Sequence, residues 1–215
     1  MYKIDNIVLN IPHSSAEGVL ESGWSIDILP HVRRWTDWDT DKIFCDFNKQ
    51  IKPVIFPYSR FVCDTERLLN DPMNAIGQGI IYERFDGVCR NMDEVDKSAI
   101  MRLYHRHIGR LRSKLTRTSL LIDCHSFPSD LYDVDICIGF NNDWSKPCYF
   151  LIDTFKRHFE QRGYTVALNS PYSNSISPTM PFYYPSIMIE LNKRVYKEDI
   201  MRIKSAIHAL YLKVL

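Results

Sequence analysis

The chain has 215 residues, of which 45% are hydrophobic and 25% are charged, a composition typical of an ordinary globular protein and not of a disordered or fibrous one. Lysine and arginine number 27 and aspartate and glutamate 26, so the formal net charge is +1 and gives no overall attraction to nucleic acid or to an anionic membrane surface. No stretch approaches the roughly 20 apolar residues that a membrane span requires, and the first residues carry no secretory leader pattern. We therefore expect a single domain over residues 1–215 that binds neither nucleic acid nor membrane.

Short β-type runs alternate with longer helical runs along the chain. In chain order, the predicted elements are a strand over 7–11, a helix over 39–51, a strand over 54–57, a helix over 93–115, strands over 119–122 and 135–140, a helix over 150–162, strands over 165–168 and 186–191, and a helix over 198–215. The strand runs are largely apolar, as expected of strands covered on both faces. The pattern predicts an α/β fold with a mixed, mostly parallel central sheet and flanking helices. In such sheets the functional site lies beyond the carboxyl ends of the strands.

The number and spacing of the cysteines bear on the cellular compartment of the protein. Six of them are scattered along the chain without any Cys-x-x-Cys pair: Cys45, Cys63, Cys89, Cys124, Cys137 and Cys148. Several lie inside apolar runs, where a free thiol behaves as a small hydrophobic side chain. We expect free thiols in a reduced cytoplasm rather than the disulfide framework of a secreted protein.

Polar side chains gather where the predicted strands end. His13 follows the first strand, His125 follows the strand over 119–122, and Glu190 lies inside the last strand. Neutral histidine is a preferred zinc ligand, and catalytic zinc sites combine three protein ligands with an open position for water. A carboxylate nearby can take the proton of that water. From spacing alone, the histidines could equally be loop or capping residues, and Asp123 could be a turn residue or an acceptor that orients His125.

Six short segments, in order along the chain, resemble those of one family. They are Ile11-Pro12-His13-Ser14, Thr36-Asp37-Trp38, Tyr58-Ser59-Arg60-Phe61-Val62 followed by Asp64 and Arg67, Tyr104-His105, Leu121-Ile122-Asp123-Cys124-His125-Ser126, and Ile189-Glu190-Leu191 followed by Tyr196. On these segments the chain resembles the N-formylglutamate amidohydrolase (N-formylglutamate deformylase) family nearly from end to end. Members of that family are similar to zinc carboxypeptidases in fold and catalytic layout. The resemblance therefore implies a zinc-carboxypeptidase-like (phosphorylase/hydrolase-like) α/β fold.

The resemblance also implies one bound Zn2+ ion and a set of ligands for it. His13 and His125 become two of the ligands, and Asp37 of the Thr-Asp-Trp motif becomes the third. Asp37 could instead cap the helix that follows it. Three other carboxylates are close enough in sequence to compete for the third place: Asp39, Asp41 and Glu17.

Two residues are implied to act on the reacting atoms. Glu190 resembles the general base and acid, which takes a proton from the attacking water and delivers it to the leaving amine. Its apolar neighbours in the chain fit a carboxylate with a raised pKa, although a salt bridge to Lys193 or Arg194 is the ordinary alternative. His105 resembles a family position that polarises the scissile carbonyl, and His107 could take its place.

Arg60 and Arg67 are the expected binders of a substrate carboxylate, because a guanidinium grips a carboxylate through two parallel hydrogen bonds. Either arginine could instead form an ion pair with Asp64 or Glu66. Glu66 is also a departure from the family, which usually has Asn before this arginine, and an acid there would repel a substrate carboxylate. Met188, where many relatives have a polar residue, is a second departure. Both leave the exact substrate open.

Asn169 and Tyr172 resemble residues at the rim of the substrate site. They lie in the run Leu-Asn-Ser-Pro-Tyr-Ser, which is equally typical of a turn. The prediction is therefore that they contact the substrate, with a purely local turn as the alternative.

Taken together, these observations predict a zinc-dependent hydrolase that cleaves the amide bond of a small N-acyl amino acid such as N-formylglutamate, or of a short peptide. The alternatives are a hydrolase of another acyl amino acid or of a cell-wall peptide, and a non-catalytic binding protein on the same scaffold. A serine hydrolase using Ser14 or Ser126 would need a Gly-x-Ser-x-Gly elbow, which the sequence lacks. The glycine-containing run over 77–82 lacks the Lys-Ser/Thr of a phosphate-binding loop.

Overall fold

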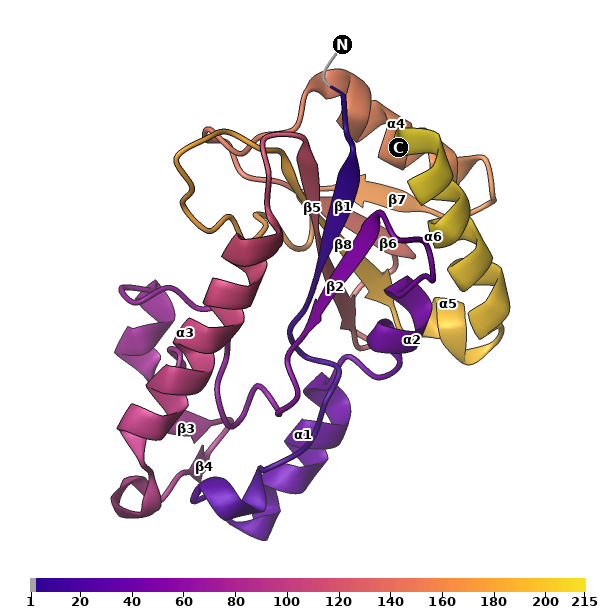
Figure 1. Cartoon of the computed structure of the whole chain (residues 1–215). Coiled ribbons are helices and arrows are strands. Elements are labelled where there is room, and N and C mark those ends of the chain that lie inside the picture. Colours follow the sequence, from indigo (N-terminus) through magenta and orange to yellow (C-terminus); the bar gives the residue numbers. More distant parts are fainter. Residues whose placement is uncertain (1–2) are drawn as a thin grey trace.

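A six-stranded sheet forms the centre of the computed structural model, which describes residues 3–215 (Figure 1). Its strand order is β2-β1-β5-β8-β6-β7. Neighbouring strands are parallel except where β6 runs antiparallel to β8. The prediction of a mixed, mostly parallel sheet is thus confirmed. The strands are β1 (Asn6–Ile11), β2 (Ile51–Ile55), β5 (Ser119–Phe127), β6 (Ile136–Gly139), β7 (Val166–Leu168) and β8 (Ser186–Asn192).

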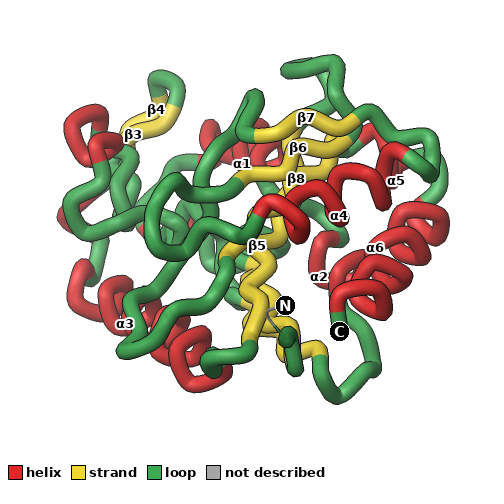
Figure 2. Tube along the Cα trace, turned by 90° about the horizontal axis from the view of Figure 1, so that it is seen from above, coloured by secondary structure: helices red, strands yellow, loops and turns green. Residues whose placement is uncertain are grey.

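Helices cover both faces of this sheet (Figure 2). Helices α2, α4 and α6 contribute to the large apolar cluster on one face, and α3 contributes to a smaller cluster on the other. The helices are α1 (Leu29–Trp35), α2 (Thr40–Phe44), α3 (Lys97–Lys114), α4 (Tyr149–Glu160), α5 (Arg194–Lys197) and α6 (Ile200–Val214). A separate short hairpin joins β3 (Arg84–Phe85) to β4 (Val88–Cys89). Of the helices in the described part of the chain, none has the length and apolar character to cross a membrane.

Alternation along the central strands decides which side chains build the core and which build the site. Successive side chains of a strand point to opposite faces. Ile122 and Ile189 belong to the large cluster with α2, α4 and α6. Leu121 belongs to the smaller cluster with α3, so Asp123 and His125, at the same parity, lie on the α3 face. The sheet therefore presents its polar residues to the α3 side, where a cavity lies.

The predicted helix over 39–51 is wrong in its second half. Helix α2 ends at Phe44, and Ile51 already begins β2. Between them, the side-chain oxygens of Asp46 and Asn48 accept hydrogen bonds of 3.1 and 2.9 Å from backbone N–H groups two residues further on. This local bonding competes with the helical pattern and turns the chain back towards the sheet.

The strand predicted over 119–122 is longer than expected. β5 continues to Phe127, because β8 pairs with it as far as the register Phe127↔Asn192. His125 therefore lies within a strand and not in the loop that follows it. Its side chain still reaches the cavity, since every second residue of β5 points to that face.

Two helix starts also differ from the prediction, in each case because a carboxylate caps the helix later than expected. Asp96 accepts a hydrogen bond from the N–H of Ala99, so α3 begins after 96. Asp199 accepts hydrogen bonds from the N–H groups of Met201 and Arg202. The predicted helix over 198–215 therefore corresponds to α6 and begins two residues later than expected, whereas the short α5 before it lies outside the prediction.

Candidate functional site

Two histidines and one aspartate meet at the carboxyl ends of β1 and β5. His13 follows β1, Asp37 follows α1, and His125 lies in β5; all three are buried. Ligand atoms of the three residues lie within 4.8 Å of one another. The Nδ1 atoms of His125 and His13 lie 3.2 and 3.7 Å from Oδ2 of Asp37. The structure thus brings together the three side chains that the sequence suggested as metal ligands.

The backbone and two hydroxyl groups hold Asp37 in this position. Its N–H donates to the carbonyl oxygen of His13 at 2.9 Å. This bond joins the loop after α1 to the loop after β1. The hydroxyl of Ser126 donates to Oδ1 of Asp37 at 3.2 Å, and the hydroxyl of Tyr196 donates to Ser126 at 3.1 Å. Asp37 does not cap α2, whose N-cap residue is Asp39. Its carboxylate is therefore committed to the histidines.

The second ring nitrogen of each histidine binds a buried carboxylate. Nε2 of His13 lies 2.8 Å from Oδ1 of Asp64, and Nε2 of His125 lies 3.0 Å from Oδ1 of Asp123. A carboxylate on one nitrogen places the proton there and leaves the other nitrogen free to bind a metal, an arrangement that usually accompanies metal-bound histidine. Nδ1 of His13 is buried and has no hydrogen-bond partner among the described residues. These features fit a metal ion between the two Nδ1 atoms and Asp37.

Burial and neighbouring charges oppose each other in setting the ionisation of these groups. Burial lowers the pKa of His125, but Asp123 and Asp37 outweigh it and raise that pKa well above the usual range. Burial raises the pKa of Asp37, yet both histidines together hold it below its ordinary value. With no ion bound, the cluster therefore keeps a carboxylate against a protonated imidazole. A cation in the same place would replace that proton.

Asp64 is a fully buried hub that joins both arginines to His13. Arg60 donates from Nη2 to Asp64 at 3.0 Å, Nε of Arg67 lies 3.6 Å away, and the hydroxyl of Tyr82 donates at 2.5 Å. The side chains of Arg60 and Arg67 are 19% and 24% exposed, and both line the cavity. Their charges and His13 hold the pKa of Asp64 well below its usual range, despite burial, which raises it.

Glu190 faces the same cavity from β8, beside His125 in the strand register. It is 9% exposed, and its Oε2 atom has no hydrogen-bond partner within residues 3–215. Burial raises the pKa of Glu190 to about 8, with Asp37 adding to the rise and His125 opposing it. The two cations proposed as salt-bridge partners bind elsewhere. Lys193 donates to a backbone carbonyl of α1 and Arg194 pairs with two aspartates.

Glu66 turns away from the arginines and towards the sheet. One of its oxygens accepts a hydrogen bond from the side-chain amide of Asn10, and the other lies 3.8 Å from Nε2 of His125. Burial, with the charge of Asp123, raises the pKa of Glu66 to about 7. Glu66, Asp123 and His125 form a second group of potential metal ligands within 4.8 Å of one another. The expected repulsion of a substrate carboxylate is reduced because the Glu66 side chain is engaged here.

The structure corrects the placement of His105. Helix α3 turns Tyr104 and His107 towards the sheet and leaves His105 exposed to solvent, because residues three and four apart share a helix face. Nε2 of His107 lies 2.7 Å from Oδ1 of Asn10, whose amide nitrogen donates to Asp123 at 2.8 Å. Burial lowers the pKa of His107 to about 4. His107 thus supports the site from behind as a neutral group, and His105 does not line the cavity.

The two predicted rim residues have different surroundings. Tyr172 lines the cavity, and burial together with Glu190 raises its pKa. Asn169 has a φ of 51°, and its side chain accepts a hydrogen bond from the N–H of Phe140 at 2.8 Å. Asparagine tolerates this left-handed conformation better than most residues. Asn169 therefore shapes a turn outside the cavity lining, which was the ordinary alternative.

The competitors for the third ligand position do not join the histidines. Asp39 has a φ of 62° and pairs with Lys42 at 2.5 Å, and Glu17 is exposed. Neither they nor Asp41 belong to a potential metal group in the described part of the chain. Among the carboxylates considered from the sequence, Asp37 alone lies with both histidines.

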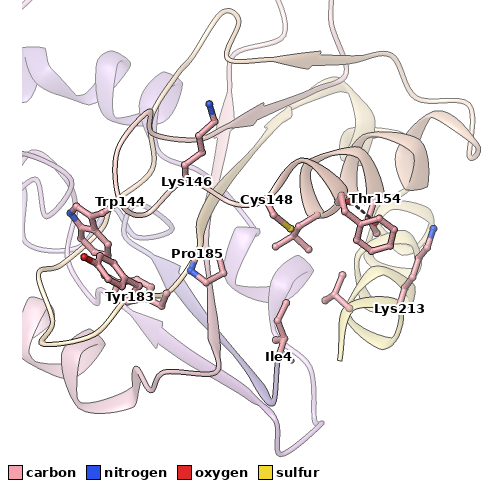
Figure 3. Close-up of a pocket in the computed structure, with 12 residues that line it drawn as sticks. Ile4, Trp144, Lys146, Cys148, Thr154, Tyr183, Pro185 and Lys213 are labelled. Atoms are coloured by element: carbon pink, nitrogen blue, oxygen red, sulfur yellow. Dashed lines mark hydrogen bonds between the residues drawn. The ribbon is translucent and has the colours of Figure 1, made fainter. Parts of the chain in front are cut away.

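Two cavities differ in their relation to these residues. The cavity over the candidate metal ligands has a volume of about 1030 Å³ and reaches from Glu190 to α3. A second, more apolar cavity of about 370 Å³ lies near the start of α4 (Figure 3), with Trp144 at one end and Lys213 at the other. None of the predicted site residues lines the second cavity. The larger cavity is therefore the candidate active site.

Comparisons with known proteins identify the family and the fold of this chain. Residues 5–197 match the profile of a family described as N-formylglutamate amidohydrolase. The fold is similar to that of the N-formylglutamate amidohydrolase from Ralstonia eutropha JMP134, with a TM-score of 0.79 and 17% identity over 99% of this chain and 93% of that one. It is also similar to a gene product of Agrobacterium tumefaciens, with a TM-score of 0.68 and 18% identity over 98% and 90% of the two chains. No curated protein matches the sequence.

Structural likeness at such low identity shows a shared fold and leaves the activity open. The family match is independent of it and extends over nearly the whole chain. The chain belongs to the N-formylglutamate amidohydrolase family, and the protein is an amidohydrolase.

Proposed function

We propose that the protein is a zinc-dependent hydrolase of N-acyl amino acids, with N-formylglutamate as the first candidate substrate. His13, Asp37 and His125 would hold one Zn2+ ion, and Glu190 would act as general base and acid. The observation that carries the proposal is the pair of buried histidines, each fixed by a carboxylate at Nε2 and directing Nδ1 towards Asp37.

Two nitrogen ligands and one carboxylate form a donor set that suits catalytic zinc. When bound, zinc polarises a carbonyl group and lowers the pKa of a water ligand to about 7. The alternative set of Glu66, Asp123 and His125 fits less well, because Asp123 is already occupied. Its Oδ1 accepts from Asn10 and faces His125, and its Oδ2 accepts from the N–H of Ile176 at 2.9 Å.

Glu190 would transfer the proton that amide hydrolysis requires, from the attacking water to the leaving nitrogen. Its free oxygen faces the cavity next to His125, and its raised pKa makes it a strong acceptor that can later act as an acid. It takes one proton from the attacking water, whose oxygen forms a bond to the acyl carbon. As the C–N bond breaks, Glu190 gives the proton to the nitrogen, so the products are a carboxylic acid and an amine, which ionise at neutral pH to a carboxylate and an ammonium group.

The two arginines are suited to the anionic parts of the substrate. Arg60 has a buried Nε atom without a hydrogen-bond partner in the described chain, so it has a donor to offer despite its bond to Asp64. Arg67 lies beside it and also lines the cavity. A guanidinium donor in a partly buried site stabilises the negative charge that develops on a carbonyl oxygen, or binds a carboxylate.

The test is to measure formate release from N-formylglutamate by protein that was stripped with a chelator and then reloaded with Zn2+. We expect activity to return with about one zinc per chain and kcat to fall at least about 100-fold in Glu190→Gln, which is the usual contribution of a general base. Exposed Glu198, changed to Gln, is the matched control. Activity that survives complete metal removal, or that is unchanged in Glu190→Gln, would contradict the proposal.

A further inference from the structure

The active-site cavity continues well beyond the candidate metal ligands, along α3. We propose that the substrate is longer than an N-acyl amino acid, namely an N-acylated peptide of about three residues whose free carboxylate is bound by Arg112. The inference rests on the proposed function for the reacting end of the substrate and adds the other end.

One wall of the cavity is a face of α3. Tyr104, Ile108 and Arg112 line it at successive four-residue intervals, so they lie on one side of the helix. With a rise of about 1.5 Å per residue, the eight residues from Tyr104 to Arg112 cover about 12 Å. Tyr104 marks the inner end, because it packs in one apolar cluster with Val62 and Cys63, directly before Asp64. Arg112 marks the outer end.

The opposite wall is the extended segment 172–179, which runs in the same direction. It begins at Tyr172, whose ring packs against Phe127 at the carboxyl end of β5. Towards its end, the carbonyl of Pro178 accepts a hydrogen bond of 2.5 Å from Tyr184, which packs in one apolar cluster with Leu111, the neighbour of Arg112. The two walls are joined by an apolar cluster that includes Ile108 of α3 and Ile176 of the segment.

The dimensions of this cavity suit a short peptide better than a single amino acid. An extended chain advances about 3.3–3.6 Å per residue, so about 12 Å corresponds to three or four residues. The volume of about 1030 Å³ is at the upper end of what drug-sized ligands need. An N-formyl amino acid held at the metal ligands would leave the outer part of the cavity without any contact to the substrate.

The charge of Arg112 indicates what the outer end binds. Arg60 and Arg67 share the carboxylate of Asp64, whereas Arg112 forms no ion pair within 4.0 Å with any of the residues 3–215. Asp143 lines the same end, but its Oδ1 accepts two hydrogen bonds from Ser145. Arg112 is therefore the cavity arginine whose charge is not neutralised by a neighbour, and a carboxylate is its natural ligand.

The experiment compares three probes: N-formylglutamate, the tripeptide formyl-Glu-Ala-Ala with a free carboxylate, and the same tripeptide as its amide. In Arg112→Gln we expect the KM of the free-acid tripeptide to rise about 10-fold with kcat nearly unchanged, because a charge-assisted bond to the bound substrate is lost. The amide and N-formylglutamate should be unaffected. Arg106, exposed on the outer side of the same helix, gives the matched control Arg106→Gln, which should change none of the three.

Binding of the probes to Glu190→Gln protein, followed by calorimetry, separates this inference from the proposed function. If the unsubstituted, zinc-loaded protein cleaves none of the probes, but the free-acid tripeptide binds to Glu190→Gln protein and this binding is lost when Arg112→Gln is added, the catalytic proposal fails and the peptide site stands. If N-formylglutamate is cleaved with a higher kcat/KM than the free-acid tripeptide, the peptide site is overturned while the catalytic proposal stands. Equal effects of Arg112→Gln on the acid and the amide would also overturn it.

Discussion

The same three strands, β1, β5 and β8, build two unlike surfaces. The side chains of these strands that belong to the large cluster with α2, α4 and α6 are aliphatic, apart from the thiol of Cys124. Those that face α3 include Asn10, Asp123, His125 and Glu190, which are tied by hydrogen bonds or face the active-site cavity. One face thus supplies stability through burial, and the other holds buried polar groups whose pairing is costly to disturb. The comparison predicts that substitutions on the two faces have different consequences.

The largest effect on folding is expected from the apolar face. Changing Ile122 to Ala removes a fully buried side chain of β5 and should lower the free energy of unfolding by about 2–5 kcal/mol. Zinc affinity of the protein that remains folded should stay close to normal, because the side chain points away from the ligands. Urea unfolding and metal titration measure the two quantities. Leu212→Ala, at an exposed position, is the control. If it lowered the free energy of unfolding as much as Ile122→Ala does, Ile122 would not be a core residue as described.

On the polar face, Glu190 should make the metal-free protein sensitive to pH. Its pKa in the folded protein is about 8 against an ordinary value of 4.5, so folding favours the protonated form. The stabilisation is complete below about pH 4.5 and is lost as the pH rises through about 8, with a total on the order of a few kcal/mol.

Glu190→Gln lacks this ionisation. Without metal, the variant should therefore gain stability relative to the unsubstituted protein as the pH is raised from 5 to 9, and thermal unfolding in the presence of a chelator measures the difference. A constant difference across that range would show that the carboxyl group is not desolvated as described.

A smaller effect is expected where the polar face supports the metal ligands. In Asp123→Asn, the group that fixes the His125 ring loses its charge, and zinc affinity should fall about 10–100-fold. A competition titration with a chromophoric chelator measures the loss. Asp133→Asn changes an exposed acid near β6 and should leave the affinity unaltered. Equal affinities of the two variants would remove Asp123 from its supporting role.

The smallest effect concerns the outer end of the cavity. Asp143 is the acid that shares this end with Arg112, so Asp143→Asn should lower the KM for a free-acid peptide by a few fold and leave that for its amide unchanged. Steady-state kinetics at low and high salt check this, because a screened charge effect shrinks as the ionic strength rises. A change that is independent of salt would point to a structural cause.

Local pattern predicted the strands of the central sheet, and strand ends together with a family motif indicated three of the residues that meet at the site. His13, Asp37 and His125 could be selected because each lies next to a recognisable strand or motif. The role of Asp64 could not be predicted in this way, because its contact with His13 depends on how a loop distant in sequence folds across β1. The sequence marked Asp64 only as the residue three before Arg67 and as a possible ion-pair partner of Arg60 or Arg67.

Two residues that were predicted to contact the substrate, His105 and Asn169, lie outside the cavity lining. The pair His105 and His107 looks equivalent in sequence, and only the packing of α3 on the sheet decides which ring is buried. Asn169 matched both a rim residue and a turn residue, and its left-handed backbone settles the turn. Both choices depend on tertiary contacts rather than on local sequence.

The register that sets His125 opposite Glu190 has a consequence for how this protein gains its activity. The two residues come from strands far apart in the sequence, and a slip of one position would turn Glu190 into the apolar cluster and Ile189 into the cavity. A partly folded chain that lacks the β5–β8 pairing cannot bring Glu190 next to His125, even if all of its helices have already formed. Recovery of activity after dilution from denaturant therefore reports one long-range event, the docking of β8, which is expected to be slow because contacts distant in sequence form late.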